Sequence, residues 1–228
     1  MNSGPLTYAI GDVHGCAPLL DALLERIADH AGDRAHRLVF LGDYIDRGPD
    51  SAGVLHTISR LAWAEPDRVT CLMGNHERML LDALHTPQAA ERWLYNGGDA
   101  TLASFGAHEA ADLPRDTLDW IEALPTLHGD AAHWYVHAGF RPGAEIPDPD
   151  DHNRLWIREP FLEGDHDFGR HVVHGHTPQR NGRPEQRRFR TNLDTGAVYG
   201  GALTAGVFSE MQGPAVALLQ VKAASVTA

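Results

Sequence analysis

Cysteine is scarce in this chain of 228 residues. It occurs at two positions, Cys16 and Cys71, which excludes a disulfide framework and a zinc knot built from cysteines. We expect both to be free thiols in a reducing, cytoplasmic compartment. Cys16 is interpreted as a small buried residue at the start of a helix rather than as a redox-sensitive thiol.

Long apolar runs and surplus basic charge are absent as well. No segment approaches the roughly 20 apolar residues that span a bilayer, and the first residues lack the basic start and apolar block of a signal peptide. The net charge is −12 at pH 7. Because binding to phosphodiesters depends on a basic surface, we expect neither a membrane nor a nucleic-acid polymer as a partner. Any reaction at a phosphate group must therefore depend on side chains within a small site and not on a broad basic surface.

Strand-like and helix-like segments alternate in the first part of the chain. The hydrophobic fraction of 43% supports one sizeable core, so we expect a single domain over residues 1–228, with a frayed tail at about 222–228. Apolar runs at 6–10, 37–41 and 68–73 are each followed by a stretch with apolar residues three and four apart. This order predicts a parallel sheet with helical crossovers.

The rest of the chain changes character. Residues 87–123 are predicted to be mostly helical, with breaks at 96–98 and at Pro114. The last third contains strand-like runs linked by glycine- and proline-bearing turns, which predicts a second, more antiparallel sheet. The expected fold is therefore of the α/β class, a sandwich of two mixed sheets flanked by helices. The role of residues 141–169 stays open.

The three early strand-like runs end alike. Each finishes with an apolar residue and a glycine, followed by Asp12, Asp43 or Asn75. The carboxyl ends of parallel strands meet at one edge of a sheet, where ligands bind. Glycine lets the backbone turn sharply there and lets loops approach closely. We therefore expect these three oxygen donors to converge.

Further candidate side chains stand close to these donors and after two later strand-like runs. They are His14, Asp46, Arg47, His76, His137 and His176. Carboxylates, an amide and imidazoles together favour manganese, iron or zinc over calcium or magnesium. Counted together with the three oxygen donors above, the carboxylates, amide and imidazoles supply six metal donors on converging loops. This number indicates two divalent ions rather than one.

Two metal ions about 3.5 to 4 Å apart lower the pKa of a bridging water and hold phosphoryl oxygens for in-line attack. The donor set therefore predicts phosphoester hydrolysis. Arg47 is expected to clamp the phosphoryl group, since a guanidinium matches it in a bidentate manner. His76 is expected to protonate the leaving alkoxide, with Asp46 holding the imidazole in its donor form.

Five motifs, in this order, resemble those of PPP-type metallophosphoesterases: GDVHG, GDYIDRG, GNHE, HAG and HGHTP. Within that superfamily the chain is similar to the small bacterial and phage-lambda serine/threonine protein phosphatases. NGGD, LWIR and LDTGAVYGGALT resemble the same branch, and the similarity runs from about residue 8 to beyond residue 204. The resemblance implies a calcineurin-like sandwich with a two-metal centre, usually loaded with manganese in assays.

The resemblance also implies individual roles. One metal would be held by Asp12, His14 and the bridging Asp43, and the second by Asp43, Asn75, His137 and His176. Asp46 and His76 would form the acid pair, while Asn75, Arg47 and, in the LWIR motif, Arg158 would contact the phosphoryl group. His174 falls where apolar strand ends stand in the other motifs, so we expect a buried, hydrogen-bonded strand residue and no ligand.

The substrate stays open between two hydrolytic hypotheses. The first is a protein phosphatase acting on phosphoserine or phosphothreonine, with phosphotyrosine as an alternative. The second is a symmetrical dinucleoside tetraphosphatase or another nucleotide pyrophosphohydrolase. Members of that group typically carry glutamine in place of His14 and asparagine in place of Asp46, which favours the first. A non-catalytic scaffold with this fold would be expected to have lost a ligand or the acid pair. None of these residues is missing from the sequence, which argues against a scaffold.

One short motif is a decoy. The tripeptide Asp194-Thr195-Gly196 matches that of aspartic proteases, but those enzymes need two carboxylates that share a proton. The sequence has one copy. We therefore interpret Asp194 as part of a turn that leads into the last strands.

Overall fold

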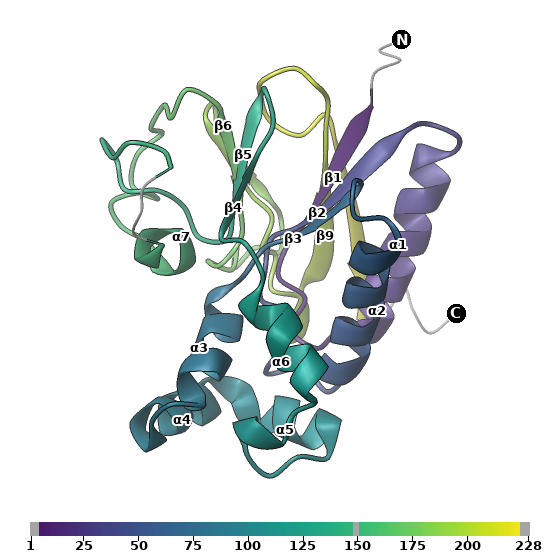
Figure 1. Ribbon diagram of the computed structural model, residues 1–228. Coiled ribbons are helices and arrows are strands. Elements are labelled where there is room, and N and C mark those ends of the chain that lie inside the picture. The colour runs from purple at the N-terminus through teal and green to yellow at the C-terminus, as the bar shows by residue number, and fades with distance from the viewer. Residues whose placement is uncertain (1–4, 148–150, 224–228) are drawn as a thin grey trace.

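The first of two β-sheets carries the N-terminal strands (Figure 1). The computed structural model describes residues 5–147 and 151–223. In spatial order the strands of this sheet are β10 (Ala217–Lys222), β9 (Ala202–Phe208), β1 (Leu6–Ile10), β2 (His36–Phe40) and β3 (Val69–Cys71). Strands β1, β2 and β3 are parallel, as predicted, whereas β9 pairs antiparallel with β1 and β10 antiparallel with β9.

The second sheet contains shorter strands. In spatial order they are β4 (Leu127–Gly129), β5 (His133–Val136), β6 (His171–His174), β8 (Arg190–Asn192) and β7 (Glu185–Gln186). The pairs β5–β6 and β6–β8 are parallel. The prediction of two mixed sheets is confirmed. The assignment of all C-terminal strands to a more antiparallel second sheet is wrong, because β9 and β10 add to the edge of the first sheet at β1.

Two helices connect the parallel strands of the first sheet, α1 (Ala17–Ala31) between β1 and β2 and α2 (Ser51–Ala64) between β2 and β3, and α3 (Asn75–Ala83) follows β3. The apolar residues at intervals of three and four, such as Leu20, Leu23 and Ile58, are buried against the sheet in one large hydrophobic cluster. The predicted crossovers are therefore confirmed.

The segment after α3 is a run of short helices. It contains α4 (Pro87–Trp93), a π-helical turn (Leu94–Gly98), α5 (Asp99–Phe105), a 3₁₀ turn (Ala110–Asp112) and α6 (Arg115–Glu122). Both predicted breaks are confirmed. Gly97 has a left-handed φ of 102°, and Pro114 is the residue that precedes the first turn of α6.

A layer of buried hydrophobic side chains separates the sheets. Residues of the first sheet such as Val39 and Phe208 pack there against Tyr135 and Val173 of the second. On the outer face of the second sheet, Phe140, Ile157 and Phe161 form another cluster with Val136 and Val172. The latter cluster shows that residues 139–147 and 151–169, which include the short helix α7 (His152–Trp156), cover this face.

The fold places several strand ends along one edge of the sandwich. Loops after β1, β2, β3, β5 and β6 meet there, and backbone hydrogen bonds join them. The Val13 N–H donates to the Asp43 carbonyl at 3.0 Å, and the Gly175 N–H donates to the His137 carbonyl at 2.8 Å. The predicted ligands are therefore fixed relative to one another by main-chain contacts.

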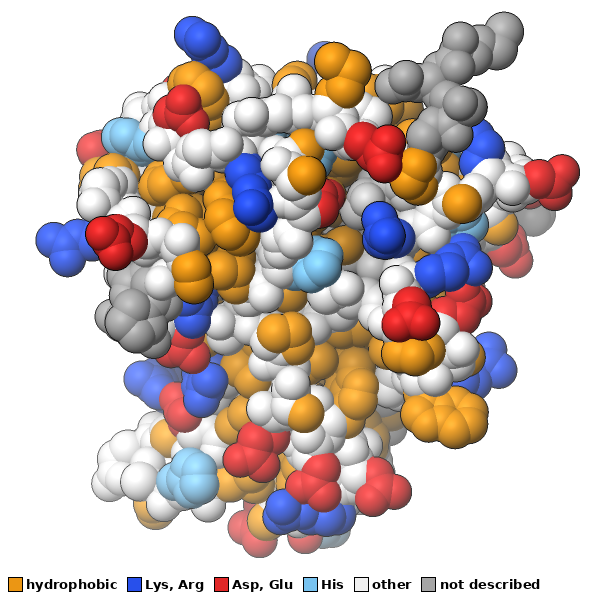
Figure 2. Space-filling view, turned by 45° about the horizontal axis from the view of Figure 1, so that its top comes forward, with side chains coloured by type: hydrophobic (Ala, Val, Ile, Leu, Met, Phe, Trp, Pro, Cys, Tyr) orange, Lys and Arg blue, Asp and Glu red, His pale blue; other side chains and the backbone are white. Residues whose placement is uncertain are grey.

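Other expectations concern the termini and the surface. Lys222 ends β10, and residues 224–228 of the tail expected to fray lie outside the described residues. None of the described helices is both long and apolar enough to cross a membrane. On the face shown in Figure 2, acidic and basic side chains are interspersed, with hydrophobic side chains visible between them.

Candidate functional site

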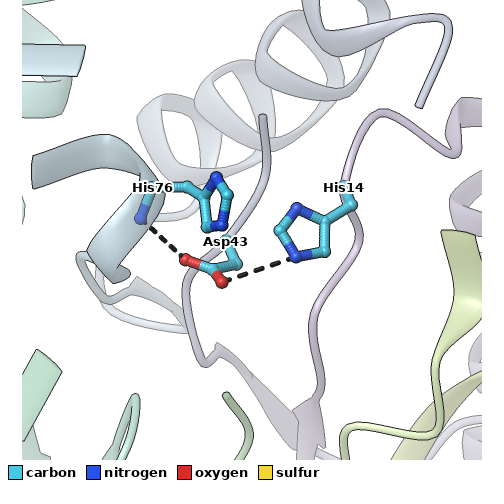
Figure 3. A group of neighbouring side chains, drawn as sticks. All are labelled: His14, Asp43 and His76. Atoms are coloured by element: carbon cyan, nitrogen blue, oxygen red, sulfur yellow. Dashed lines mark hydrogen bonds and ion pairs between the residues drawn. The ribbon is translucent and has the colours of Figure 1, made fainter. Parts of the chain in front are cut away.

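The predicted metal ligands come together at this edge. All six are buried and less than a tenth exposed: Asp12, His14, Asp43, Asn75, His137 and His176. Among the described residues, two groups have ligand atoms that all lie within 4.8 Å of one another. One contains His14, Asp43 and His76 (Figure 3), and the other contains Asp43, His137 and His176. Asp43 belongs to both, as a bridging carboxylate would.

The histidine rings are oriented by backbone carbonyls. His14 Nδ1 lies 2.8 Å from the Ile45 carbonyl, and His137 Nδ1 lies 2.9 Å from the Leu41 carbonyl. Each Nδ1 must carry the proton to make this bond, which leaves Nε2 of the neutral ring as an electron-pair donor. Burial supports the neutral form, since it lowers the pKa of His14 to about 3 and also lowers the pKa of His137.

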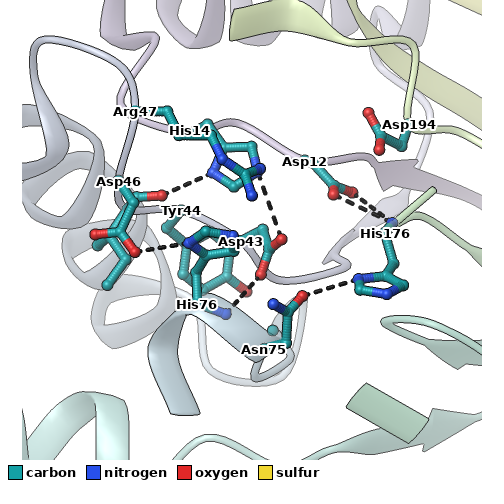
Figure 4. Close-up of polar contacts among 12 residues, drawn as sticks. Asp12, His14, Asp43, Tyr44, Asp46, Arg47, Asn75, His76, His176 and Asp194 are labelled. Carbon is teal, nitrogen blue, oxygen red and sulfur yellow. Dashed lines mark hydrogen bonds and ion pairs between the residues drawn. The ribbon is translucent and has the colours of Figure 1, made fainter. Parts of the chain in front are cut away.

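These Nε2 atoms lie close to other electron-pair donors, and that of His14 also accepts a hydrogen bond from the Arg47 guanidinium. His137 Nε2 lies 2.9 Å from Asn75 Oδ1, and His14 Nε2 lies 3.5 Å from Asp43 Oδ2. Asn75 Oδ1 is also 2.8 Å from His176 Nδ1 (Figure 4). Electron-pair donors at such distances repel one another unless a proton or a cation lies between them. The residues therefore fit the two divalent metals that their chemistry predicts.

Asp12 belongs to neither of the two groups. Its carboxylate accepts the His176 backbone N–H, with nitrogen–oxygen distances of 3.1 and 3.2 Å. The Asp194 carboxyl group lies beside it. Burial, followed by the neighbouring charges of Asp194 and Asp43, raises the pKa of Asp12 well above its ordinary value. A cluster of three buried carboxyl groups is costly without positive charge, which is a second reason that cations suit the site.

The two residues predicted to form the acid pair are in contact. His76 Nδ1 lies 2.6 Å from Asp46 Oδ2, and both side chains are fully buried. Asp46 also accepts hydrogen bonds from the Trp93 indole at 3.0 Å and the Thr101 hydroxyl at 2.7 Å. Burial lowers the pKa of His76, but the Asp43 charge and the Asp46 hydrogen bond outweigh it, so the pKa of His76 lies above its ordinary value.

An open cavity of about 270 Å³ lies over these groups. The residues that line it are Asp43, Arg47, Asn75, His76, Asn96, Trp156, Arg158, His176, Pro178 and Tyr199. Both predicted phosphate arginines are therefore at the cavity. The Arg47 guanidinium lies 2.6 Å from His14 Nε2, and Tyr199 packs over it with 5.7 Å between Cζ and the ring centre.

Backbone strain is concentrated at the site. Five described residues other than glycine have a positive φ, and all five are predicted site residues: His14, Asp43, Asp46, Arg47 and His176. Such conformations cost about 1–3 kcal/mol each and persist only where the surroundings enforce them. The positions of these side chains are therefore imposed by the tertiary structure.

Two glycines make room for the ligands. A Cβ atom on Gly74 would lie 2.2 Å from Asp43 Oδ1, and one on Gly175 would lie 2.1 Å from Asp12 Oδ1. Neither position tolerates a side chain without displacing a carboxylate. The expectation that glycine precedes each ligand to permit close approach is confirmed at both.

Sequence reasoning overlooked the residues that support the site. Glu77 accepts the backbone N–H groups of Gly74, Asp43 and Tyr44 at 2.8–2.9 Å and that of Ile45 at 3.3 Å. Its place inside the GNHE motif was a usable signal. Trp93 and Thr101, which hold Asp46, carry no local signal because they are 47 and 55 residues away from it.

Three sequence interpretations concern residues next to the ligands. His174 is a buried strand-end residue with hydrogen-bond partners at Gly175 and Arg190, as expected, and it belongs to neither metal group. Asp194 forms the expected turn by accepting the Gly196 N–H at 3.0 Å, but its position beside Asp12 was not foreseen. Cys16 precedes α1 as expected, but it is only partly buried. Burial raises the pKa of its thiol to about 11.

Comparison with known proteins agrees with this geometry. Residues 6–201 match the model of the calcineurin-like phosphoesterase family. The chain belongs to this family. It is a hydrolase that acts on phosphoesters, and the sandwich and the resemblance seen in its motifs are confirmed.

Curated relatives of the phosphoesterase include a protein phosphatase and a dinucleoside tetraphosphatase. The phosphoesterase is 35% identical over 210 residues to serine/threonine-protein phosphatase 1 of Salmonella typhimurium, an alignment that covers 86% of this chain and 89% of the relative. It is 39% identical over 140 residues to a symmetrical bis(5'-nucleosyl)-tetraphosphatase of Dechloromonas aromatica, an alignment that covers 60% of this chain and 44% of the relative.

A solved structure shares the fold of the phosphoesterase. A protein serine/threonine phosphatase from Saccharomyces cerevisiae superposes with a TM-score of 0.60 at 16% identity, covering 96% of this chain and 80% of the other. At this identity the likeness concerns the fold alone.

Proposed function

We propose that this phosphoesterase is a metal-dependent protein phosphatase that hydrolyses phosphoserine and phosphothreonine monoesters. The observation that carries the proposal is the buried His76–Asp46 pair, 2.6 Å apart, in which His76 lines an open cavity. An alkoxide leaving group needs a proton, and a histidine with a raised pKa supplies it at neutral pH. The similarity to a protein phosphatase over most of both chains supports the same substrate class.

The ligand set supports two divalent ions. Asp12, His14 and Asp43 would hold one, and Asp43, Asn75, His137 and His176 the other. We propose manganese, with iron and zinc as alternatives, because imidazole and carboxylate oxygen together suit these ions. When bound, the ions supply an activated water and positive charge beside the phosphoryl oxygens.

The remaining roles belong to the chain itself. Arg47, Arg158 and Asn75 line the cavity and would bind and orient the phosphoryl group. His76 would donate its Nε2 proton to the leaving oxygen, and Asp46 would keep the opposite nitrogen, Nδ1, protonated. Trp93 and Thr101 hold Asp46 and so fix the direction of the imidazole.

The second candidate is symmetrical cleavage of dinucleoside tetraphosphates, which the similarity to tetraphosphatases over 60% of this chain favours. Those enzymes typically carry asparagine in place of Asp46 and glutamine in place of His14. A departing nucleotide is a weaker base than an alkoxide and needs a proton less. The His76–Asp46 pair therefore supports a phosphomonoester as the substrate.

Two assays with metal-free and reconstituted protein test the proposal. Hydrolysis of para-nitrophenyl phosphate should vanish with chelator and return with manganese, and full activity in excess chelator would overturn the metal centre. A phosphopeptide panel should then be compared with diadenosine tetraphosphate. A higher kcat/KM for phosphopeptides supports a protein phosphatase, whereas a higher value for the dinucleotide assigns the second function.

The cellular setting follows from composition. The described structure contains Cys16 and Cys71 as free thiols, which agrees with a reducing compartment, and we propose a cytoplasmic location. We further propose that residues 1–228 act as one catalytic domain.

A further inference from the structure

His176 stands at the centre of a tight turn. Its φ is 67°, and the Thr177 N–H donates to the Gly175 carbonyl at 2.8 Å, so one hydrogen bond closes three residues. A three-residue turn with a positive central φ is strained and rare. The turn directs the His176 imidazole to Asn75 and its backbone N–H to Asp12 (Figure 4). Contacts from outside the turn must hold it in this form.

His174 supplies one of these contacts. Its Nδ1 lies 3.1 Å from the Gly175 carbonyl, the same oxygen that closes the turn. Its Nε2 lies 3.4 Å from Arg190 Nη1. Because a carbonyl only accepts and a guanidinium only donates, the imidazole must be neutral and carry its proton on Nδ1. Arg190 therefore fixes which nitrogen of His174 donates to the turn.

The Arg190 guanidinium is itself held in place. Nη1 also donates to Glu185 Oε2 at 2.5 Å, and Nη2 donates to the Leu162 carbonyl at 3.1 Å. The Phe161 ring packs against both partners, with its centre 5.7 Å from Arg190 Cζ and 5.0 Å from the centre of the His174 ring. A chain of hydrogen bonds thus runs from Glu185 on the edge strand β7, through Arg190 and His174, to the turn.

Packing alone does not account for Arg190. The residue is 2% exposed, and within the described part of the chain its Nε has no hydrogen-bond acceptor. A buried N–H without a partner lowers stability, which an apolar side chain of similar volume would avoid.

The other strand ends of the site show the apolar alternative. Where this strand carries His174 before the glycine, the three earlier ones carry Ile10, Leu41 and Met73. The pair of His174 and Arg190 therefore adds directed hydrogen bonds at a place where an apolar residue suffices for burial.

We propose that Arg190 is a positioning residue for the metal centre, and that it acts through His174 to hold the turn that presents His176. Without this chain of hydrogen bonds the turn would relax, and the imidazole would leave its place beside Asn75. The inference rests on the ligand set of the proposed function. It does not depend on whether the substrate is a phosphoprotein or a nucleotide.

The test measures manganese binding to the purified, metal-free protein, with the electron paramagnetic resonance signal of free Mn²⁺ as the readout. The variants are His174→Met, Arg190→Met and their combination. Methionine is the residue that precedes Gly74 at the matching strand end. In Arg190→Met the Glu185 carboxylate, which is 28% exposed, keeps Arg187 as a partner at 2.8 Å.

His171→Met is the matched control. His171 is as buried as His174 and lies on the same strand, β6. Its ring contacts the Thr191 hydroxyl at 2.8 Å and the Arg188 carbonyl at 3.3 Å, away from the turn. A loss of stability common to buried histidines of this strand would therefore be seen in the control as well.

The wild type should bind two manganese ions. His174→Met should weaken the binding of one of them about 10- to 100-fold, the usual effect of losing a group that orients a metal ligand. Arg190→Met should weaken the same ion, and the double variant should be no worse than His174→Met, because Arg190 acts through His174. His171→Met should unfold at lower denaturant concentration yet bind both ions as the wild type does.

An unchanged manganese affinity in His174→Met would overturn the inference, and so would losses that simply add in the double variant. An equal loss of affinity in His171→Met would also overturn it. If Arg190→Met does not fold, Arg190→Lys replaces it in the same cycle, because lysine keeps a cation beside Glu185 but loses the fork that also reaches His174.

Failure of the proposed function is visible in the wild type alone. A wild type that binds no manganese would overturn the proposed metal centre. A wild type that binds two ions but hydrolyses no phosphomonoester would overturn the proposed function and leave the role of Arg190 to the variants.

Discussion

His76 Nδ1 and Asp46 Oδ2 lie 2.6 Å apart, with 1% and 0% of these residues exposed to solvent. This contact joins the start of α3 to the loop after β2. It gives a neutral or protonated imidazole a fixed direction, with Nε2 toward the cavity.

Replacement of His76 by asparagine should affect substrates according to their leaving groups. The kcat for a phosphoserine peptide should fall about 10²- to 10⁴-fold, the usual contribution of a general acid. The loss on para-nitrophenyl phosphate should be much smaller, because nitrophenolate leaves without a proton. Steady-state kinetics on both substrates measure this, with the exposed His85→Asn as control. Equal losses would remove His76 from the acid role.

Replacement of Asp46 by asparagine should change the pH profile. The Asp46 carboxylate helps to raise the pKa of His76, so the protonated acid persists to higher pH in the wild type. Without the carboxylate the pKa of His76 falls, and the acid form is lost earlier as pH rises. The alkaline limb of kcat for a phosphoserine peptide should therefore move to lower pH. A limb that stays in place would contradict this coupling.

Removal of the Arg158 side chain should weaken the binding of inorganic phosphate. The guanidinium lines the cavity, and a charge-assisted hydrogen bond to an anion contributes about 1.5–3 kcal/mol. Arg158→Ala should therefore raise the inhibition constant of phosphate about tenfold or more. Arg183→Ala, an exposed arginine outside the cavity, serves as control. An unchanged constant would place Arg158 outside the phosphate site.

Glu77 should matter for stability more than any surface acid. Its buried carboxyl group accepts four backbone N–H groups, and burial raises its pKa to about 7. Each unsatisfied buried N–H costs about 1–3 kcal/mol, so Glu77→Ala should lower the free energy of unfolding by at least about 3 kcal/mol. Denaturant unfolding measures this against the exposed Glu91→Ala. A loss below about 1 kcal/mol would show that water replaces the carboxylate.

Asp130 should make stability depend on pH at a distance from the active site. It accepts hydrogen bonds from the backbone of Ala132 and His133 and from the Tyr135 hydroxyl. Partial burial raises its pKa, but the hydrogen bonds outweigh this and lower the pKa below its ordinary value. The stabilisation is therefore present above the unfolded-state pKa and is lost as pH falls through the folded-state value.

Asp130→Ala should accordingly lower the free energy of unfolding by about 2 kcal/mol at neutral pH. The difference from the wild type should shrink in acid. Thermal unfolding at several pH values, with the exposed Asp67→Ala as control, checks this. A difference that stays constant down to pH values of about 3 would mean that the Asp130 charge contributes nothing.

Much of the fold was predictable because its signals are local. Helical periodicity in α1 and α2 and the apolar runs of β1 and β2 depend on neighbours within one or two turns. The sheet to which β9 belongs was not predictable. The sequence of a buried apolar strand is compatible with either sheet. Its place is decided by the backbone N–H and C=O groups of β1 that have no partner until β9 pairs with them.

The convergence of the predicted donor motifs was predictable for a related reason. Glycine followed by Asp12, Asp43 or Asn75 combines a conformational requirement with a donor atom inside a few residues. The residues that hold Asp46 were not predictable, because Trp93 and Thr101 reach it only after α4 and α5 fold back. The same holds for Asp194 beside Asp12, since the sequence shows its turn but not its neighbour.

By itself, the sequence determined the parallel strand–helix order, the donor types at the strand ends and the class of reaction. Only the tertiary structure decided which donors lie together, because Asp43 stands between two histidine groups drawn from distant loops. It also decided that five site residues adopt left-handed backbone conformations. Short-range patterns encode what a segment can do, whereas strain and charge at the site are set by contacts between segments far apart in the chain.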